Sequence, residues 1–246
     1  MNRFVQFVVV LILSSSIMAL LIVVSTNQTT RKTKARQLVK DEQNVQRVMK
    51  EVSGKIRRVN MIVEWQKVHG DKNITETALL WRIQIHDEKG QLRPFYQRFV
   101  IQGDNVHLDA LYINLQELKD NPKIAFLQGS TLCLFNHLYG EGEKPDDTNR
   151  IVPVGSVPLG YRSRFSGPSL FENILWQRLW TFYNSPVLAK KNGVTFTEVP
   201  PISRLVKTGA LYEVCLGKNL GLEIIEHHDP STVAAMLKDA AVEKKH

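Results

Sequence analysis

The apolar residues of this chain form three patterns that follow one another along the sequence. The first is a predominantly apolar run from Phe4 to Val24, with no charged residue between Arg3 and Arg31. A sparse stripe with spacings of three and four residues follows, and the remainder shows the alternation that is typical of β-strands. These patterns predict, in order, a transmembrane helix, a helical stalk and a β-rich domain.

The run over residues 4–24 is long enough to cross a membrane as one helix, because about 20 apolar residues span the hydrocarbon core. A cleaved signal peptide is the alternative, but its apolar region would be only about 7–15 residues long. A cut after Ser25, with Val23 and Ser25 at the small-residue positions, is the one that the sequence tolerates. The length favours an uncleaved signal-anchor and therefore a single-pass membrane protein.

Positive charge is concentrated beside the anchor rather than on the domain. The formal net charge is +8, yet residues 26–60 carry ten basic and three acidic residues, and the rest of the chain from Met61 carries 21 of each. The basic residues nearest the run are Arg31, Lys32, Lys34, Arg36 and Lys40. A basic residue near an anionic lipid surface is worth about 1 kcal/mol, so we expect contact with lipid headgroups. The domain lacks an excess of basic residues, which argues against nucleic acid as a partner.

Two rules disagree about the side of the membrane on which the domain lies. The basic residues that follow the run place the domain in the cytoplasm by the positive-inside rule. A very short N-terminal tail is instead typical of export-type anchors, and long domains translocate largely regardless of charge. We predict the extracytoplasmic side, with the cytoplasm as the alternative.

Residues 26–59 are predicted to form a basic helical stalk. Its apolar stripe, with spacings of four, three, four and three, consists of Val45, Met49, Val52, Ile56 and Val59. This spacing is that of a short coiled-coil seam. Such a short stripe fits equally a parallel homodimer that continues from the membrane and a helix that lies on its own domain. Gly54 weakens the helix by up to about 1 kcal/mol.

The pattern changes to alternation in residues 60–228, which are predicted to form one β-rich soluble domain. One face of a strand is marked by Leu79, Trp81, Ile83 and Ile85. Turn signals such as Asp87–Gly90 separate the short apolar runs, as in an antiparallel β-sandwich or barrel. Residues 230–246 form a C-terminal helix or tail. The predicted fold class is therefore mainly β (α+β), with one inserted amphipathic, aromatic helix.

The inserted helix is predicted at about residues 169–184, because Ser169 and Glu172 have capping-box spacing. Its two apolar faces consist of Phe171, Leu175, Leu179 and Phe182 on one side, and Trp176, Trp180 and Tyr183 on the other. A helix that is apolar on two sides is either buried between layers or presented to a partner. Burial is favoured, and the second face remains a candidate binding surface for a protein or a glycan.

Candidate catalytic residues are His107, Asp109 and His137. On a strand, Asp109 would share a face with His107, so an orienting hydrogen bond between them is expected. No nucleophile motif such as GxSxG is present, and the GxGxxG and P-loop patterns are absent. A hydrolase with a site assembled from these scattered residues is therefore the alternative, and a non-enzymatic binding or assembly domain is the main hypothesis.

The candidate metal ligands lie in one acidic loop and are Glu141, Glu143, Asp146 and Asp147. Carboxylates of this kind can bind Ca²⁺, but their spacing matches no EF-hand loop, so we predict no metal and no other cofactor. The two cysteines, Cys133 and Cys215, each lie within an apolar run. Two reduced thiols in the core are favoured over a disulfide for that reason.

Overall fold

The computed structural model describes residues 32–52, 57–69, 73–87, 89–119, 124–146, 148–216, 221–227 and 230–243. The chain divides into two compact units, Met1–Gln43 and Asn44–His246. The predicted anchor at residues 4–24 lies outside the described residues, as do Arg31 and Asp147. Within the part of the chain that is described, no helix is long and apolar enough to span a membrane.

The first unit is described over residues 32–43, which are helical. The side chains of residues 32–40 are exposed, and they include the basic groups Lys32, Lys34, Arg36 and Lys40. The contact of these residues with lipid headgroups remains a prediction.

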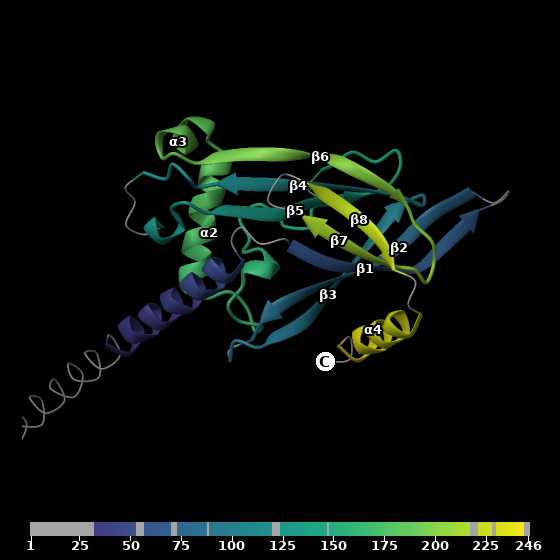
Figure 1. The fold of residues 1–246 in the computed structure, drawn as a ribbon, viewed down its shortest axis with the longest axis horizontal. Helices are drawn as coiled ribbons and strands as arrows, with labels where there is room; N and C mark the ends of the chain where they lie inside the picture. Colours follow the sequence, from purple (N-terminus) through teal and green to yellow (C-terminus); the bar gives the residue numbers. More distant parts are fainter. Residues whose placement is uncertain are drawn as a thin grey trace, which may run out of the picture. The chain divides into compact units, whose positions relative to one another are not determined.

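The second unit contains two antiparallel sheets (Figure 1). The five-stranded sheet has the order β3-β2-β1-β7-β8, and the three-stranded sheet has the order β5-β4-β6. The strands of the first are β1 (Arg57–His69), β2 (Asn73–His86), β3 (Leu92–Gln102), β7 (Leu211–Leu216) and β8 (Leu222–His227). Those of the second are β4 (Asn105–Asn114), β5 (Thr131–Tyr139) and β6 (Thr195–Leu205). The mainly β, α+β class is confirmed.

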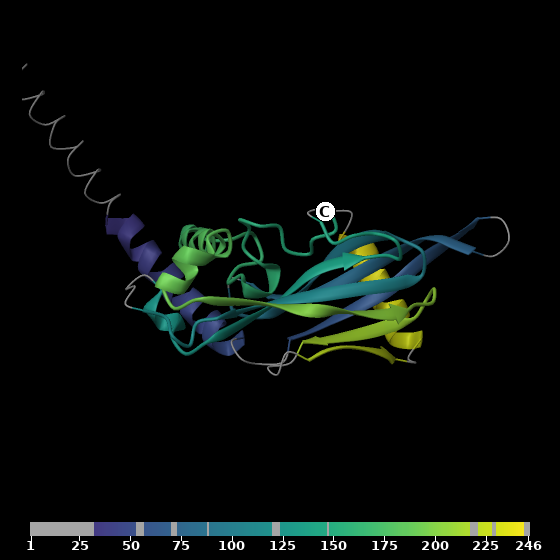
Figure 2. The ribbon, with the colours of Figure 1, turned by 90° about the horizontal axis from the view of Figure 1, so that it is seen from above.

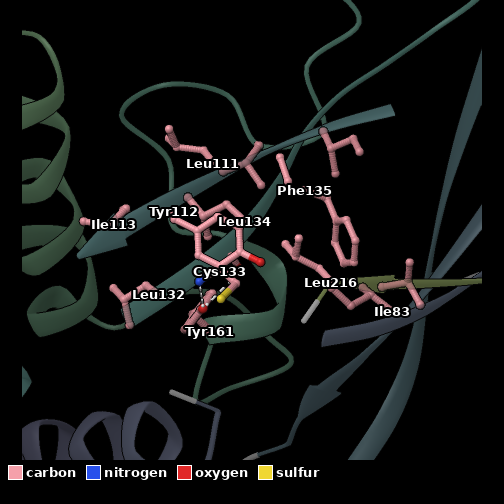
Figure 3. Close-up of a cluster of buried hydrophobic side chains, with 14 of the residues drawn as sticks. Ile83, Leu111, Tyr112, Ile113, Leu132, Cys133, Leu134, Phe135, Tyr161 and Leu216 are labelled. Carbon is pink, nitrogen blue, oxygen red and sulfur yellow. Dashed lines mark hydrogen bonds between the residues drawn. The ribbon is translucent and has the colours of Figure 1, made fainter. Parts of the chain in front are cut away.

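One core joins the two sheets. Trp81 of β2 contacts Phe135 of β5 edge to face, with ring centroids 5.2 Å apart. Figure 3 shows the part of this core that lies around β4 and β5, where the Tyr161 hydroxyl accepts the backbone N–H of Cys133 at 2.8 Å. Cys133 is buried, Cys215 is half-buried, and no disulfide joins them. The predicted core thiol is thus confirmed for Cys133.

Alternation alone would assign the second face of β2, which carries Leu80 and His86, to solvent. Leu80 is instead buried in a separate small cluster with Val233 of α4 (Pro230–Glu243). Figure 2 shows α4 alongside the strands of the five-stranded sheet. His86 is also buried, and its ring lies 3.4 Å from the carboxylate of Glu51. Contacts with other elements therefore cover both positions.

The aromatic helix α2 (Leu170–Tyr183) begins as predicted, with a full capping box between Ser169 and Glu172. Trp176 and Trp180 are 0% and 2% exposed, which confirms burial and removes both as a binding surface. Pro186 ends this helix and also begins α3 (Pro186–Lys191), where a proline is tolerated at the first helical position. Two short 3₁₀ helices, η1 (Ala125–Leu127) and η2 (Leu159–Tyr161), complete the described elements.

The predicted coiled-coil seam is divided between two elements. Residues 44–52 of the second unit are helical, and Val45 and Met49 are buried in the domain's own core. Val59 belongs to β1, which starts at Arg57, so the stripe does not continue as one helix. The structure therefore supports the alternative that this helix lies on its own domain, and it gives no support to a coiled coil.

Candidate functional site

Asp109 and His137 lie on neighbouring strands, β4 and β5, at a break in strand pairing. The register of β4 shifts between Leu108 and Ala110 against both β5 and β6. Asp109 alone faces two residues on each neighbour, Asn136 and His137 in β5 and Pro200 and Pro201 in β6. β5 and β6 therefore each carry a β-bulge here, a feature that is common beside functional sites. Asp109 Oδ2 lies 2.9 Å from Nδ1 of His137, and Asp109 Oδ1 accepts the His137 backbone N–H at 2.9 Å.

This contact assigns separate roles to the two ring nitrogens of His137. A carboxylate can only accept hydrogen bonds, so Nδ1 carries the proton that faces Asp109. The second nitrogen, Nε2, is buried and has no hydrogen-bond partner among the described residues, and the whole residue is 7% exposed. An unpaired buried polar atom costs about 1–3 kcal/mol, which a suitably placed ligand group would recover. Nε2 is thus the atom of this site that is available for binding or for proton transfer.

Both residues line an open pocket of about 520 Å³, which we call the His137 pocket. Its remaining walls consist of Asn136, Tyr139, Pro145, Arg150, Tyr183, Glu198, Val199, Pro200 and Pro201. Pro200 and Pro201 are the two residues of the β6 bulge, where the loss of two N–H donors disturbs no regular pairing. The β5 bulge therefore places the backbone N–H and the ring of His137 against Asp109, and the β6 bulge places two prolines in the wall of the same pocket.

The pocket mixes hydrogen-bond donors with acceptors. The Arg150 guanidinium donates to Asn136 Oδ1 at 2.8 Å, which holds it at the edge of the pocket. Burial, and to a lesser extent the charge of Asp109, raises the pKa of the Tyr139 phenol, so this hydroxyl remains a donor at neutral pH. Asp109 and Glu198 provide carboxylates. With one guanidinium against two carboxylates, the walls suit a polar ligand without a large negative charge.

The structure assembles part of the predicted catalytic set. Asp109 bonds to His137 rather than orienting His107 as expected, because the bulge in β5 brings His137 against it. The His107 ring instead stacks on Tyr139, with centroids 5.3 Å apart and an angle of 14°. Tyr183, predicted on the aromatic face of the helix, is half-buried and lines the same pocket, unlike the two tryptophans.

Sequence reasoning missed most of the pocket, including Tyr139, Arg150 and Glu198. These three residues come from a strand end, a loop and a different strand, and no spacing links them. An isolated antiparallel bridge between His137 and Arg150 brings the loop back to β5. Pairing of this kind has no local sequence signal.

Two carboxylates of the acidic loop form hydrogen bonds within the loop itself. Glu143 accepts the backbone N–H of Gly140, and Asp146 accepts the backbone N–H and the hydroxyl of Thr148 at 2.7 and 2.6 Å. The bonds from Thr148 lower the pKa of the Asp146 carboxyl. Glu141 is exposed. Within the described ranges, no group of three or more His, Cys, Asp or Glu side chains is placed to hold a metal ion.

Comparison of the chain with protein-family models, with curated proteins and with solved structures gave no match. The chemistry of the His137 pocket is therefore argued from its own residues.

Proposed function

We propose that the chain is a single-pass membrane protein whose β domain binds a small polar ligand in the His137 pocket without transforming it. The observation that carries the proposal is the buried Nε2 of His137, which has no partner among the described residues while Nδ1 is fixed by Asp109. The pocket combines several polar groups with apolar and aromatic surface, and such polar groups fix the orientation of a bound ligand.

The ligand that fits is a neutral hydroxylated compound, such as a sugar unit of a glycan. A hydroxyl group can donate to the neutral imidazole at Nε2 and also accept from Arg150 or Tyr139. Tyr183 and the adjacent prolines add apolar surface for the carbon skeleton. A phosphate would meet two carboxylates in the same pocket, which makes it a poor ligand.

The predicted anchor at residues 4–24 would hold this domain at a membrane surface, and the basic residues that follow would contact anionic lipid. We propose the extracytoplasmic side for the domain. Protease added to right-side-out vesicles should then digest residues beyond Asn60 without membrane rupture, and protection of the domain would place it in the cytoplasm.

Saturation-transfer NMR on the full-length chain in detergent micelles tests the binding proposal. The probes are glucose and N-acetylglucosamine, each at millimolar concentration. Transfer to at least one probe is expected in the native chain and in Arg98→Thr, which lies outside the pocket. His137→Gln should abolish it. Absence of transfer to every probe, or equal transfer in His137→Gln, contradicts the proposal.

Hydrolysis is a second candidate, favoured by the Asp109–His137 contact itself. A carboxylate that orients an imidazole is the arrangement of a general base, which contributes about 10²–10⁴-fold to a rate. No Ser, Thr or Cys is among the residues that line the pocket, so the attacking group would be water. We would assay p-nitrophenyl acetate and bis(p-nitrophenyl) phosphate. Turnover that falls by about 10²-fold or more in both His137→Gln and Asp109→Asn would replace the non-enzymatic proposal.

A further inference from the structure

A second open groove, of about 460 Å³, runs beside β3, and we call it the β3 groove. One wall is formed by consecutive strand residues: Phe95, Tyr96, Gln97 and Arg98. The other consists of Ile151, Val152, Pro153, Ser156, Val157, Pro158, Leu159 and Arg162. Successive side chains of a strand point to opposite faces, so four in a row can line one groove only along the strand's edge. β3 is an outer strand of the five-stranded sheet, which agrees with this placement.

The direction of the β3 backbone groups follows from two residues. Pro94 has no N–H and is tolerated in a sheet only where its nitrogen faces away from the partner strand. The carbonyl of Gln102, eight positions further on, accepts from Glu141 N outside the sheet at 3.1 Å. The β2–β3 pairing has no register shift, so the backbone N–H and C=O groups of even-numbered β3 residues point away from β2. The N–H and C=O of Arg98 therefore face the groove, and neither takes part in a described backbone bond outside the sheet.

Two side-chain atoms in the groove also lack partners. Oε1 of Gln97 is a buried acceptor without a donor, and Nε of Arg162 is a buried donor without an acceptor. Burial lowers the pKa of the Arg162 guanidinium, and the nearby Glu172 opposes this shift. The Glu172 oxygens already accept N–H bonds from Ser163 and Ser169. An unpaired donor and an unpaired acceptor in one groove match the C=O and N–H of a peptide group.

The groove continues into a small apolar cavity of about 30 Å³ between the sheets. Gln97, Ile151 and Leu159 line both spaces, and Trp81 and Phe135 lie at the inner end. A cavity of this size accepts a group of one or two heavy atoms, such as the end of a valine side chain. The groove lining includes Arg98 and Arg162 but no carboxylate, and Arg98 is already paired with Glu64. Arg162 is therefore the cation that remains for an acidic group.

We propose that the β3 groove binds an extended peptide segment of another protein. The segment adds a strand to the sheet at Arg98, directs a small β-branched side chain toward the inner cavity, and places an acidic side chain against Arg162. Edge-strand addition of this kind draws its affinity from backbone hydrogen bonds and its specificity from pockets for alternate side chains. The groove shares no lining residue with the His137 pocket, so this inference does not depend on the function proposed for that pocket.

The probe is a fluorescein-labelled pool of blocked heptapeptides with Val at position four, Glu at position five, and Thr, Ser, Val or Ile elsewhere. Fluorescence anisotropy on the full-length chain in detergent micelles measures its binding. The control pool carries N-methyl groups on alternate peptide nitrogens, which keep the side chains but block strand pairing. We expect the control pool to bind at least about tenfold more weakly, because backbone bonds are lost. Equal binding of both pools, or no binding of the first at millimolar concentration, overturns the proposal.

The matched protein variants are Arg98→Thr and Arg98→Pro. Both remove the ion pair with Glu64, but only the proline removes the outward N–H, in the same register as the native Pro94. Binding should be at least about tenfold weaker in Arg98→Pro than in Arg98→Thr, with unchanged near-UV circular dichroism. If Arg98→Pro fails to fold, Arg162→Gln provides the second test, since it should remove the preference for Glu over Gln in the pool. Equal binding by the Thr and Pro variants, or an unchanged preference in Arg162→Gln, contradicts the proposal. Binding only to vesicles of phosphatidylglycerol would identify a lipid anion and would also contradict it.

Discussion

The two candidate sites both arise where strand pairing is interrupted, but the interruptions differ in kind. In the His137 pocket, a bulge in β5 places His137 against Asp109, which fixes one ring nitrogen and leaves the other without a partner among the described residues. In the β3 groove the sheet ends, and the available groups include the main chain of Arg98. A bulge thus provides side-chain chemistry, whereas an edge provides the repeating donors and acceptors of the backbone.

This difference predicts different ligands and separate responses to mutation. A fixed side chain recognises one functional group of a small molecule, while an edge recognises an extended chain. Because the two sites share no lining residue, a change that damages one should leave the other intact. The mutations below test whether the two sites are independent.

The largest effect is expected from Glu172→Ala. Glu172 is fully buried, and its carboxylate accepts the backbone N–H groups of Ser163 and Ser169 at 2.6 Å each. Each N–H left unpaired costs about 1–3 kcal/mol, so we expect a loss of about 2–6 kcal/mol in the free energy of unfolding. Urea denaturation measures this loss. Arg162 of the β3 groove directly precedes Ser163 in the chain, so the loss of the Ser163 bond should weaken peptide binding in the groove as well.

Glu172→Gln is the matched control, because its amide oxygen still accepts one of the two N–H groups. We expect a loss of roughly half that of the alanine variant. Sugar binding by the His137 pocket should survive in both variants wherever they remain folded. Loss of both binding activities in a folded variant would show that the sites are coupled.

Asp109→Ala should cause a smaller loss of stability and should impair the His137 pocket rather than the β3 groove. The substitution removes the acceptor for the His137 backbone N–H and for Nδ1 of its ring. We expect a loss of about 1–3 kcal/mol in the free energy of unfolding, and loss of binding in the pocket. Thermal denaturation and the saturation-transfer assay measure the two effects. Unchanged peptide binding in the β3 groove is the outcome that independence requires.

Tyr139→Phe should have the smallest effect on the free energy of unfolding, and that effect should be seen only at high pH. The native pKa of Tyr139 is raised by burial, so the protonated phenol stabilises the fold below its unfolded pKa of about 10, and this contribution is lost as the pH rises through the native value. Stability above pH 10 should therefore decline less steeply in Tyr139→Phe than in the native chain. Burial also raises the pKa of Tyr212, so this residue contributes to the decline in both the native chain and the variant. Identical declines would mean that Tyr139 titrates as a free phenol.

Much of the fold was predictable from local pattern. The alternation of Leu79, Trp81 and Ile83 placed their strand correctly, and the spacing of Ser169 and Glu172 placed the helix start. The cover of Leu80 by α4 was not predictable, because the residues in contact are far apart in the chain. The stripe of Val45 and Met49 was ambiguous for the same reason, since burial against a second copy and burial against the domain need the same spacing.

The site was only partly predictable. Asp109 and His137 were identified by their chemistry, but their contact depends on a bulge that no residue in β5 predicts. Asp109 and His107 alternate as expected, but the bulge brings His137 against Asp109, and the His107 ring stacks on Tyr139 instead, so the expected pair was wrong. The β3 groove had no sequence signal beyond Pro94, because a free edge is a property of the order of strands in the sheet.

Nitrogen-15 NMR of the histidine side chains, recorded on the full-length chain in micelles, tests the central claim most directly. Without a probe, the His137 ring should carry a proton on Nδ1 toward Asp109, and its Nε2 should be free to accept. Addition of a probe that binds should shift the Nε2 signal of His137 and leave the His107 ring nearly unchanged. A proton on Nε2 with Nδ1 as the acceptor, or an unmoved Nε2 signal while the probe is bound, would contradict the account.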